Sequence, residues 1–185
     1  MLATISGRER GETDRLLAAL AATLEAEGWP LAGVVQVNSG KPGAKHCDMD
    51  LRVLGRAEVI RISQNLGEES SGCRLDPEGL AQAVGLVEGR LQAGPKLLIL
   101  NKFGKAEIEG RGFRTVIGEA LAQGIPVVMG VKGLNRAGFE DFAGDVFILF
   151  GDTPLIRPET LNAMLARRAE ADRPTVVVLG MRPTR

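Results

Sequence analysis

One stretch decides the fold: Leu97-Leu98-Ile99-Leu100-Asn101-Lys102-Phe103-Gly104-Lys105, which continues as Ala-Glu-Ile-Glu-Gly-Arg-Gly to Gly112. Its four branched apolar residues are typical of a strand that is buried on both faces, in the middle of a parallel sheet. The polar residues that follow would then lie at the carboxyl edge of the sheet, where open α/β folds bind their ligands. Residues 102–112 contain two lysines, one arginine and three glycines, a composition that suits a binding loop and also a merely solvated one.

The rest of the chain alternates between strand and helix patterns. Apolar strand patterns cover residues 2–5, 31–37, 125–131, 146–150 and 175–179. Apolar residues at helical spacing lie between them, at Leu16 to Leu24, at Leu80 to Leu91 after the helix start Asp76-Pro77, at Phe113 to Leu121, and within Pro158 to Asp172. This alternation predicts an α/β fold with a mostly parallel sheet between helical layers.

One segment departs from the alternation. Residues 48–54 and 58–63 alternate polar and apolar side chains on either side of Gly55-Arg56. A period of two with a glycine turn predicts a β-hairpin with one solvated face. We therefore expect a hairpin inserted at about residues 48–63.

The composition excludes several classes of protein. The 185 residues are 44% hydrophobic and 25% charged, as in globular chains. The 23 basic and 23 acidic side chains cancel, so no net field indicates a nucleic-acid or anionic-membrane partner. No apolar run reaches the roughly 20 residues of a spanning helix, and the first residues are too short and interrupted for a signal peptide. The two cysteines, Cys47 and Cys73, are then expected to be reduced thiols of a cytoplasmic protein.

A degenerate phosphate-binding loop follows the first strand. In the pattern G-x-x-x-x-G-K-[ST], backbone N–H groups and the lysine bind phosphates, and the hydroxyl binds magnesium. Residues 6–13 read Ser-Gly-Arg-Glu-Arg-Gly-Glu-Thr, so Gly11 and Thr13 match, whereas Ser6 replaces the first glycine and Glu12 replaces the lysine. Because a carboxylate at Glu12 would repel a triphosphate, this motif alone is weak evidence for a nucleotide site.

A family resemblance rests on residues 11–17, 32–36, 47–51, 72–76 and 101–112. On these stretches, residues 1 to about 145 resemble an uncharacterised bacterial family related to the THEP-type nucleoside-triphosphatases, a branch of the P-loop fold. The resemblance implies a three-layer, P-loop-like domain. In the active triphosphatases the second motif ends its strand with Asp-Glu, for magnesium and for activating water, and these positions are Asn101 and Lys102 here. Members of the uncharacterised family are often encoded near molybdate-transport genes, which implies a role near molybdenum or another oxyanion.

Both motifs therefore carry charges that differ from those of the active triphosphatases, so the predicted chemistry differs from nucleotide hydrolysis. Since the two motifs lie side by side in this fold, we expect Glu12 and Lys102 to approach each other and to keep the site electrically balanced. Efficient hydrolysis is not expected. A site for a phosphate-like oxyanion remains. Its candidate residues are Gly11, Glu12, Thr13, Asn101, Lys102, Lys105 and Arg111.

A second group of residues has metal-ligating side chains. It comprises His46, Cys47, Asp48, Asp50 and the more distant Cys73. The spacing matches no standard zinc pattern, because paired C-x-x-C spacing is absent. A metal site or a redox pair forms if the hairpin brings Cys73 beside Cys47. The simpler interpretation is two small reduced thiols near the core and a surface histidine.

The carboxyl-terminal residues carry a different resemblance. Residues 146–161, Val-Phe-Ile-Leu-Phe-Gly-Asp-Thr-Pro-Leu-Ile-Arg-Pro-Glu-Thr-Leu, and residues 176–183 resemble an internal segment of N-acetylglucosamine-1-phosphate uridylyltransferase. In that enzyme the Gly-Asp after the strand supplies a magnesium-binding carboxylate, which corresponds to Asp152. The enzyme's amino-terminal nucleotide motif has no counterpart in residues 1–145. We therefore expect residues 146–185 to be a second unit, a strand–helix–strand segment packed on the same sheet and acquired by gene fusion or chimeric construction.

The sequence as a whole predicts a protein of the P-loop class that binds a nucleotide or a small oxyanion with little or no hydrolysis. Mg²⁺ with a nucleotide, or molybdate, is the ligand that the resemblance implies. Two alternatives stay open. One is an enzyme fragment related to UDP-N-acetylglucosamine pyrophosphorylase, resting on Asp152 and magnesium. The other is a non-catalytic protein-interaction module.

Overall fold

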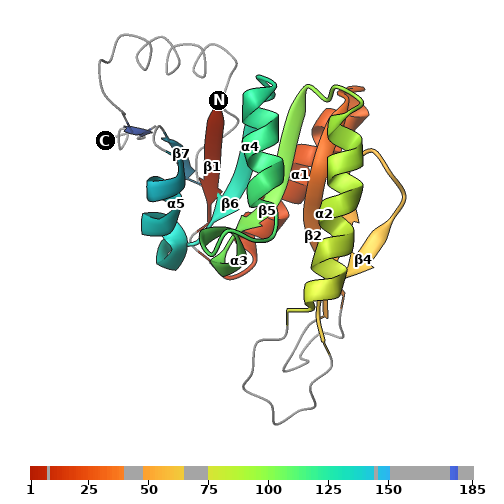
Figure 1. The fold of residues 1–185 in the computed structure, drawn as a ribbon, viewed down its shortest axis with the longest axis horizontal. Coiled ribbons are helices and arrows are strands. Elements are labelled where there is room, and N and C mark those ends of the chain that lie inside the picture. The colour runs from red at the N-terminus through yellow and green to blue at the C-terminus, as the bar shows by residue number, and fades with distance from the viewer. Residues whose placement is uncertain (8, 40–47, 65–74, 144–145, 151–175, 179–185) are drawn as a thin grey trace, which may run out of the picture.

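The computed structural model describes residues 1–7, 9–39, 48–64, 75–143, 146–150 and 176–178. They form one twisted sheet with helices on both faces (Figure 1). The strands are β1 (Leu2–Ser6), β2 (Leu31–Ser39), β3 (Asp48–Val53), β4 (Val59–Arg61), β5 (Leu97–Phe103), β6 (Val127–Val131), β7 (Val146–Phe150) and β8 (Val176–Val178). The helices are α1 (Glu12–Ala26), α2 (Pro77–Leu91), α3 (Lys105–Ile108), α4 (Arg114–Ala122) and α5 (Arg136–Ala143), with a 3₁₀ turn at Gly133–Asn135.

The order of the strands in the sheet is β4-β3-β2-β5-β6-β1-β7-β8. Strand β2 and the five strands after it in this order run parallel, whereas β3 pairs antiparallel with β2, and β4 antiparallel with β3. The predicted α/β class, the mostly parallel sheet and the inserted hairpin are therefore confirmed. This is a three-layer, P-loop-like arrangement.

The register of the central strands decides how the two sequence motifs meet. Val128 of β6 pairs with Ala3 of β1 on one side and with Ile99 of β5 on the other. The strand that precedes the degenerate loop and the strand that carries Lys102 are thus separated by β6. The prediction that the two motifs are side by side is wrong for the strands themselves, since any contact between the motifs must cross β6.

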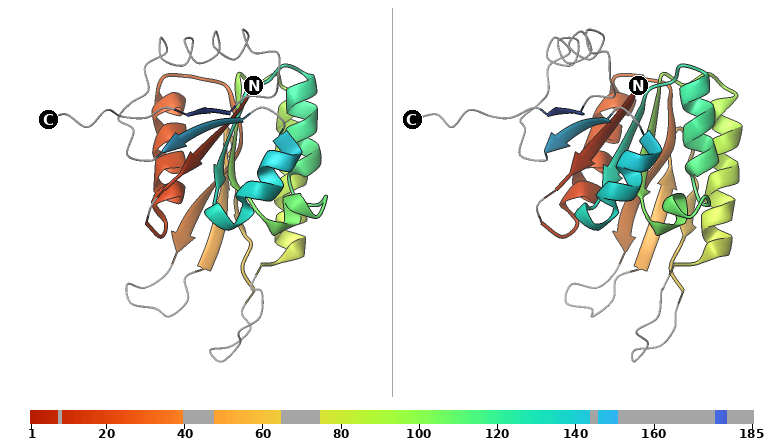
Figure 2. Two further views of the ribbon diagram at one scale, coloured as in Figure 1. Left: turned by 90° about the vertical axis from the view of Figure 1, so that its left-hand side faces the viewer. Right: turned by 60° about the vertical axis from the view of Figure 1, so that its left-hand side comes forward.

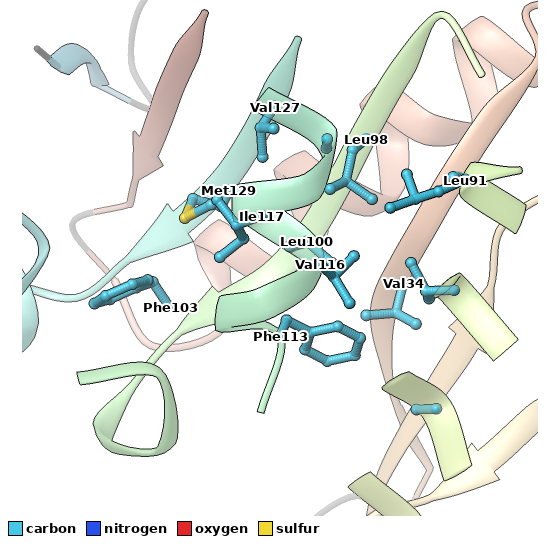
Figure 3. Packing of buried hydrophobic residues seen from close by; sticks show 14 of the residues in the cluster. Val34, Leu91, Leu98, Leu100, Phe103, Phe113, Val116, Ile117, Val127 and Met129 are labelled. Atoms are coloured by element: carbon cyan, nitrogen blue, oxygen red, sulfur yellow. The ribbon is translucent and has the colours of Figure 1, made fainter. Parts of the chain in front are cut away.

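Each face of the sheet has its own apolar core. Helix α1 covers one face, where Leu17 and Ala21 pack with Ile99 and other strand residues. Helices α2 and α4 cover the opposite face, as the side views show (Figure 2). The larger cluster lies there and joins strand residues such as Leu98 and Leu100 to Val116 and other helical residues (Figure 3). Apolar residues on both sides of β5 explain why its sequence is an unbroken apolar run.

The predicted helix start at Asp76 is confirmed. Its side chain accepts a hydrogen bond from the Glu78 N–H at 3.1 Å, and Pro77 occupies the first helical position. The fully buried stripe of α2 runs through Gly79, Ala83, Val87 and Leu91, and Leu80 and Val84 flank it half-buried.

Strand β5 and helices α3 and α5 differ from the sequence prediction. Strand β5 does not end at Leu100 but continues to Phe103, so Asn101 and Lys102 belong to the strand. Helices α3 and α5 were not predicted. The predicted helix Pro158 to Asp172 lies outside the described residues. None of the helices in the described segments is long and apolar enough to cross a membrane.

Candidate functional site

The candidate site lies at the carboxyl edge of the sheet, where β1 leads through a short loop into α1. This loop and α3 lie at the lower edge of the sheet in Figure 1. Gly11 caps α1 with a φ of 78°, a left-handed conformation that favours glycine. A helix N-terminus with a glycine before it is a common place for anions to bind.

The loop is folded tightly onto the first turn of α1. The Gly7 N–H donates to Thr13 Oγ1 at 2.8 Å, and the Glu9 N–H donates to the Glu12 carboxylate at 3.0 Å. A Cβ atom added to Gly7 would lie 2.7 Å from the Glu12 Cβ. In an intact phosphate loop, backbone N–H groups point at the phosphates. Here the Glu12 carboxylate is an internal anion that takes one of these donors.

An ion pair joins the two motifs across β6. Lys102 Nζ lies 3.2 Å from Asp14 Oδ1, with 25% of the Lys102 side chain and 11% of the Asp14 side chain exposed. The sequence analysis predicted that Lys102 approaches Glu12, but the acid that Lys102 pairs with is Asp14. Glu12 lies two residues earlier and turns its carboxylate to the Glu9 N–H.

Gly130 of β6 makes this contact across a strand possible. A Cβ atom at this position would lie 2.7 Å from Thr13 Cγ2, 3.2 Å from Leu17 Cδ1 and 3.3 Å from Lys102 Cβ. The missing side chain therefore leaves room for Thr13 and Lys102 to pack over the intervening strand. Sequence analysis did not single out Gly130, although a glycine inside an apolar strand often marks a close approach of neighbouring groups.

Asn101 precedes Lys102 in β5 and is buried. Only 5% of the residue is exposed, and neither its Oδ1 nor its Nδ2 has a hydrogen-bond partner among the described residues. Along β5, Leu98 and Leu100 belong to the core under α2 and α4, whereas Ile99 faces α1. Lys102 also reaches α1, because the pairing of β5 with β6 is irregular between Leu100 and Phe103.

Lys105 and Arg111 do not join this group. Both are strongly exposed, at 86% and 67%, and both pair with Glu109, Lys105 at a distance of 3.6 Å. The Arg111 guanidinium, and to a lesser degree the Lys105 ammonium, lower the pKa of the Glu109 carboxyl below its ordinary value. Of the predicted site residues, the structure thus brings Thr13 and Lys102 to Gly130, with Gly11, Glu12 and Asn101 beside them in the chain, and it adds Asp14.

Glu107 organises the segment after β5 and was not predicted. Its buried carboxylate accepts hydrogen bonds from the Gly104 N–H at 2.8 Å and from the Phe113 N–H at 3.1 Å. The Arg114 guanidinium donates to the Glu107 carbonyl at 3.1 Å. This carboxylate holds residues 104–113 in a compact turn, so the predicted open binding loop is a structured element.

The second predicted group lies mostly outside the described residues. This applies to His46, Cys47 and Cys73, and also to Asp152. The two remaining acids, Asp48 and Asp50, both pair with Arg61 on the neighbouring strand, Asp48 at 2.8 Å. The hydrogen bond to Asp50 raises the pKa of Arg61 above its ordinary value. In the part of the chain that the structure describes, no three His, Cys, Asp or Glu side chains are grouped so that they could hold a metal ion.

The chain is similar to one protein family and to parts of several known proteins. Residues 2–151 match the model of a family described as "Protein of unknown function (DUF2478)". The chain is 32% identical over 162 residues to the "Molybdenum import ATP-binding protein ModC 2" of Bradyrhizobium diazoefficiens, which covers 88% of this chain and 18% of that protein. It is also similar to "Bifunctional protein GlmU" of Rhodospirillum rubrum, at 60% identity over 51 residues, 28% of this chain and 11% of that protein. The GlmU of Rhizorhabdus wittichii is 38% identical over 96 residues, 51% of this chain and 21% of that protein. The chain thus spans about a fifth or less of the length of each of these relatives.

Proposed function

The chain belongs to the DUF2478 family, and we propose that it binds a phosphate-containing or similar oxyanion, as a nucleotide or as a free ion, without efficient hydrolysis. The observation that carries the proposal is the meeting of three elements at one edge of the sheet. The first turn of α1 and Lys102 of β5 meet there over Gly130, and the buried Asn101 immediately precedes Lys102 in the strand. A helix terminus, a cation and an amide are groups that bind oxyanions.

The charges of the site argue against turnover. Nucleotide hydrolysis requires Mg²⁺ held near the phosphates and a residue that orients the attacking water. An ammonium group, Lys102, stands at the strand end where a carboxylate would be needed, and the Asp14 carboxylate is already paired with it. The hydroxyl of Thr13 accepts the Gly7 N–H. These residues do not fit a magnesium ion, so the proposal is binding without magnesium-dependent chemistry.

Two groups of oxyanions are candidates for the ligand: nucleotides, such as ATP, and free ions, such as molybdate. The similarity to a protein named for molybdenum import and ATP binding supports testing ATP and molybdate together. Because the chain spans 18% of that protein, its activity does not transfer as a whole.

A thermal-shift and calorimetric panel tests the proposal. The ligands are ATP, GTP, phosphate, sulfate, molybdate and tungstate, each with and without magnesium. A ligand that binds only the folded state stabilises it by RT ln(1 + [L]/Kd), which is about 2.7 kcal/mol at a hundred times Kd. We expect at least one anion to raise the melting temperature as its concentration increases, without needing magnesium.

Two lysine variants make the panel specific. Lys102→Met removes the cation of the site, whereas Lys105→Met removes a lysine whose side chain is 86% exposed and pairs with Glu109. We expect the shift to be lost in the first variant and retained in the second. A panel without any shift, or an equal loss in both variants, would refute the proposal and leave a protein-interaction module as the better account.

The matches to GlmU favour a second candidate, a nucleotidyltransferase-related fragment that binds a uridine nucleotide with magnesium at Asp152. The observation that favours it is the 60% identity over 51 residues. A shift with UTP or UDP-N-acetylglucosamine that requires magnesium and is abolished by Asp152→Ala would support this candidate. Under the first proposal, Asp152→Ala leaves oxyanion binding unchanged.

A further inference from the structure

A lysine stands at the end of the strand that separates the two motifs. Lys132 directly follows β6, and its side chain is exposed. Within the part of the chain that the structure describes, this side chain forms no ion pair and donates no hydrogen bond. Lys102, by contrast, is paired with Asp14, and Lys105 with Glu109. The positive charge of Lys132 is therefore not balanced by a described acid.

The register of the sheet puts Lys132 between the two motif loops. Val131 is the last residue of β6, and its carbonyl accepts a hydrogen bond from the Oγ of Ser6, the last residue of β1, at 2.6 Å. On its other side Val131 pairs with Phe103, the last residue of β5. All three strands thus end at the same level. Lys132, as the next residue of β6, stands where the loops after β1 and β5 both begin.

This level of β6 is also the topological switch point of the sheet. After β1 the chain turns to one face as α1, and after β5 it turns to the opposite face as α4 (Figure 2). Strand β6 lies between β1 and β5. Open α/β sheets bind their ligands outside the carboxyl ends of the strands at such a point. Lys132 is the residue with which the middle strand ends there.

The backbone orients Lys132 toward the α1 face and holds it in place. Along β6, Val128 packs in the core under α1, and Gly130 adjoins Thr13 of that helix, whereas the intervening residues belong to the opposite core. The backbone of Lys132 is still extended, with φ of −83° and ψ of 150°, so this alternation continues to it. The Asn135 N–H donates to the Lys132 carbonyl at 2.9 Å, which fixes the turn after the strand.

We propose that Lys132 supplies the positive charge that binds the anion, and that Lys102 acts on the anion through Asp14. This inference rests on the proposed function, and it names a further binding residue of the same site. Lys102 neutralises the Asp14 carboxylate, which alone would repel an anion at the first turn of α1. Lys132 adds a charge that no described acid balances, and a hydrogen bond from an ammonium group to an oxyanion is stronger than one between neutral groups.

The test is isothermal titration calorimetry of the full chain with inorganic phosphate, molybdate and ATP, each without magnesium. For every anion that the native chain binds, Lys132→Met should weaken the affinity by about tenfold or more, the loss expected for one hydrogen bond to a charged group. Lys132→Arg keeps the charge and should retain most of the affinity. Because the side chain is exposed and unpaired among the described residues, Lys132→Met should leave the melting temperature of the ligand-free chain nearly unchanged.

Two further variants separate a specific contact from a general effect of charge. Arg15→Met removes another exposed cation without a described partner, on the first turn of α1. Its residue follows Asp14, which faces the sheet, so this change should cost clearly less affinity than Lys132→Met. The double variant Lys102→Met with Asp14→Asn removes both members of the ion pair. It should bind anions better than Lys102→Met alone, because no uncompensated carboxylate remains.

The outcomes separate this inference from the function beneath it. Anion binding that survives Lys132→Met, or that is lost equally in Arg15→Met, would overturn the inference and leave the proposed function intact. A double variant that binds no better than Lys102→Met would show that Lys102 itself contacts the anion, which also contradicts the inference. Failure of the native chain to bind any anion of the panel would overturn the proposed function and this inference with it.

Discussion

The ion pair between Lys102 and Asp14 joins β5 to the first turn of α1, and its strength follows from its geometry. The charged atoms are 3.2 Å apart, and the two side chains are 25% and 11% exposed. Coulomb's law with an effective dielectric constant of about 20 gives a gross attraction of roughly 5 kcal/mol at this distance. Desolvation and lost side-chain freedom offset most of that attraction. We therefore expect a net coupling of about 1–2 kcal/mol, above the roughly 0.2–1 kcal/mol of exposed pairs.

A double-mutant cycle measures this coupling directly. Lys102→Met, Asp14→Asn and the double variant are unfolded in urea, and their free energies of unfolding are compared with that of the native chain. Lys102→Met alone should cost about 1–3 kcal/mol, because it leaves the Asp14 carboxylate mostly buried without its partner. The double variant should lose about 1–2 kcal/mol less than the sum of the single losses.

A second cycle, with Glu12→Gln in place of Asp14→Asn, distinguishes the observed pair from the one predicted by sequence. Glu12 accepts the Glu9 N–H, so its coupling to Lys102 should be the smaller of the two. If Lys102 couples more strongly to Glu12, while Lys102→Met and Asp14→Asn act additively, then our account of the site is wrong. The pair predicted from the sequence, Glu12 with Lys102, would then be the correct one.

Three further substitutions test other parts of the site. Gly130→Ala puts a methyl group 2.7 Å from Thr13 Cγ2 and should lower the free energy of unfolding, measured in urea, by about 1–3 kcal/mol. The control is Gly118→Ala, at a helical position with nothing within 4 Å, which should raise it by about 0.5–1 kcal/mol. Equal effects of the two substitutions would argue against a crowded crossing of β6. Glu107→Gln leaves one of two buried N–H groups without an acceptor, so we expect a loss of about 1–3 kcal/mol and faster hydrogen exchange at residues 104 and 113, and unchanged exchange would contradict the role of this carboxylate. Asn101→Leu removes an unpartnered buried amide and should raise the free energy of unfolding by about 1 kcal/mol, while a loss of stability would show that the amide has a partner in the free protein.

The sequence was sufficient to predict the fold because its apolar periodicities are long and regular. The run Leu97 to Leu100 predicted a central strand, and the period of two around Gly55 predicted the hairpin, both of which the structure contains. The turn after β5 was not predictable in the same way. Its shape depends on the Glu107 carboxylate bonding the N–H groups of Gly104 and Phe113, and an isolated Glu in a glycine-rich segment carries no periodic signal.

The acidic partner of Lys102 could have been identified from the sequence of α1. Successive helical residues are about 100° apart, so Glu12 and Asp14 project from α1 in widely different directions, and only one of them can face the sheet. Asp14 lies three and seven residues before Leu17 and Ala21, in the buried stripe of α1. Extending that stripe by one turn would have selected Asp14 over Glu12. The sequence could not show that β6 separates the two motifs, because strand order depends on long-range pairing.

The charged residues at the two motif positions are paired in the structure and not left unmatched. Random replacement of the motif residues would leave charges unmatched in a partly buried position, at a cost that folding tolerates poorly. Instead the acid at the lysine position bonds a loop N–H, and the lysine at the strand end pairs with an acid on α1 across a glycine. Asn101, one residue before Lys102, is the exception, because its buried amide has no hydrogen-bond partner among the described residues. An apolar side chain there would remove the desolvation cost of the amide, which is why Asn101→Leu is expected to stabilise the fold.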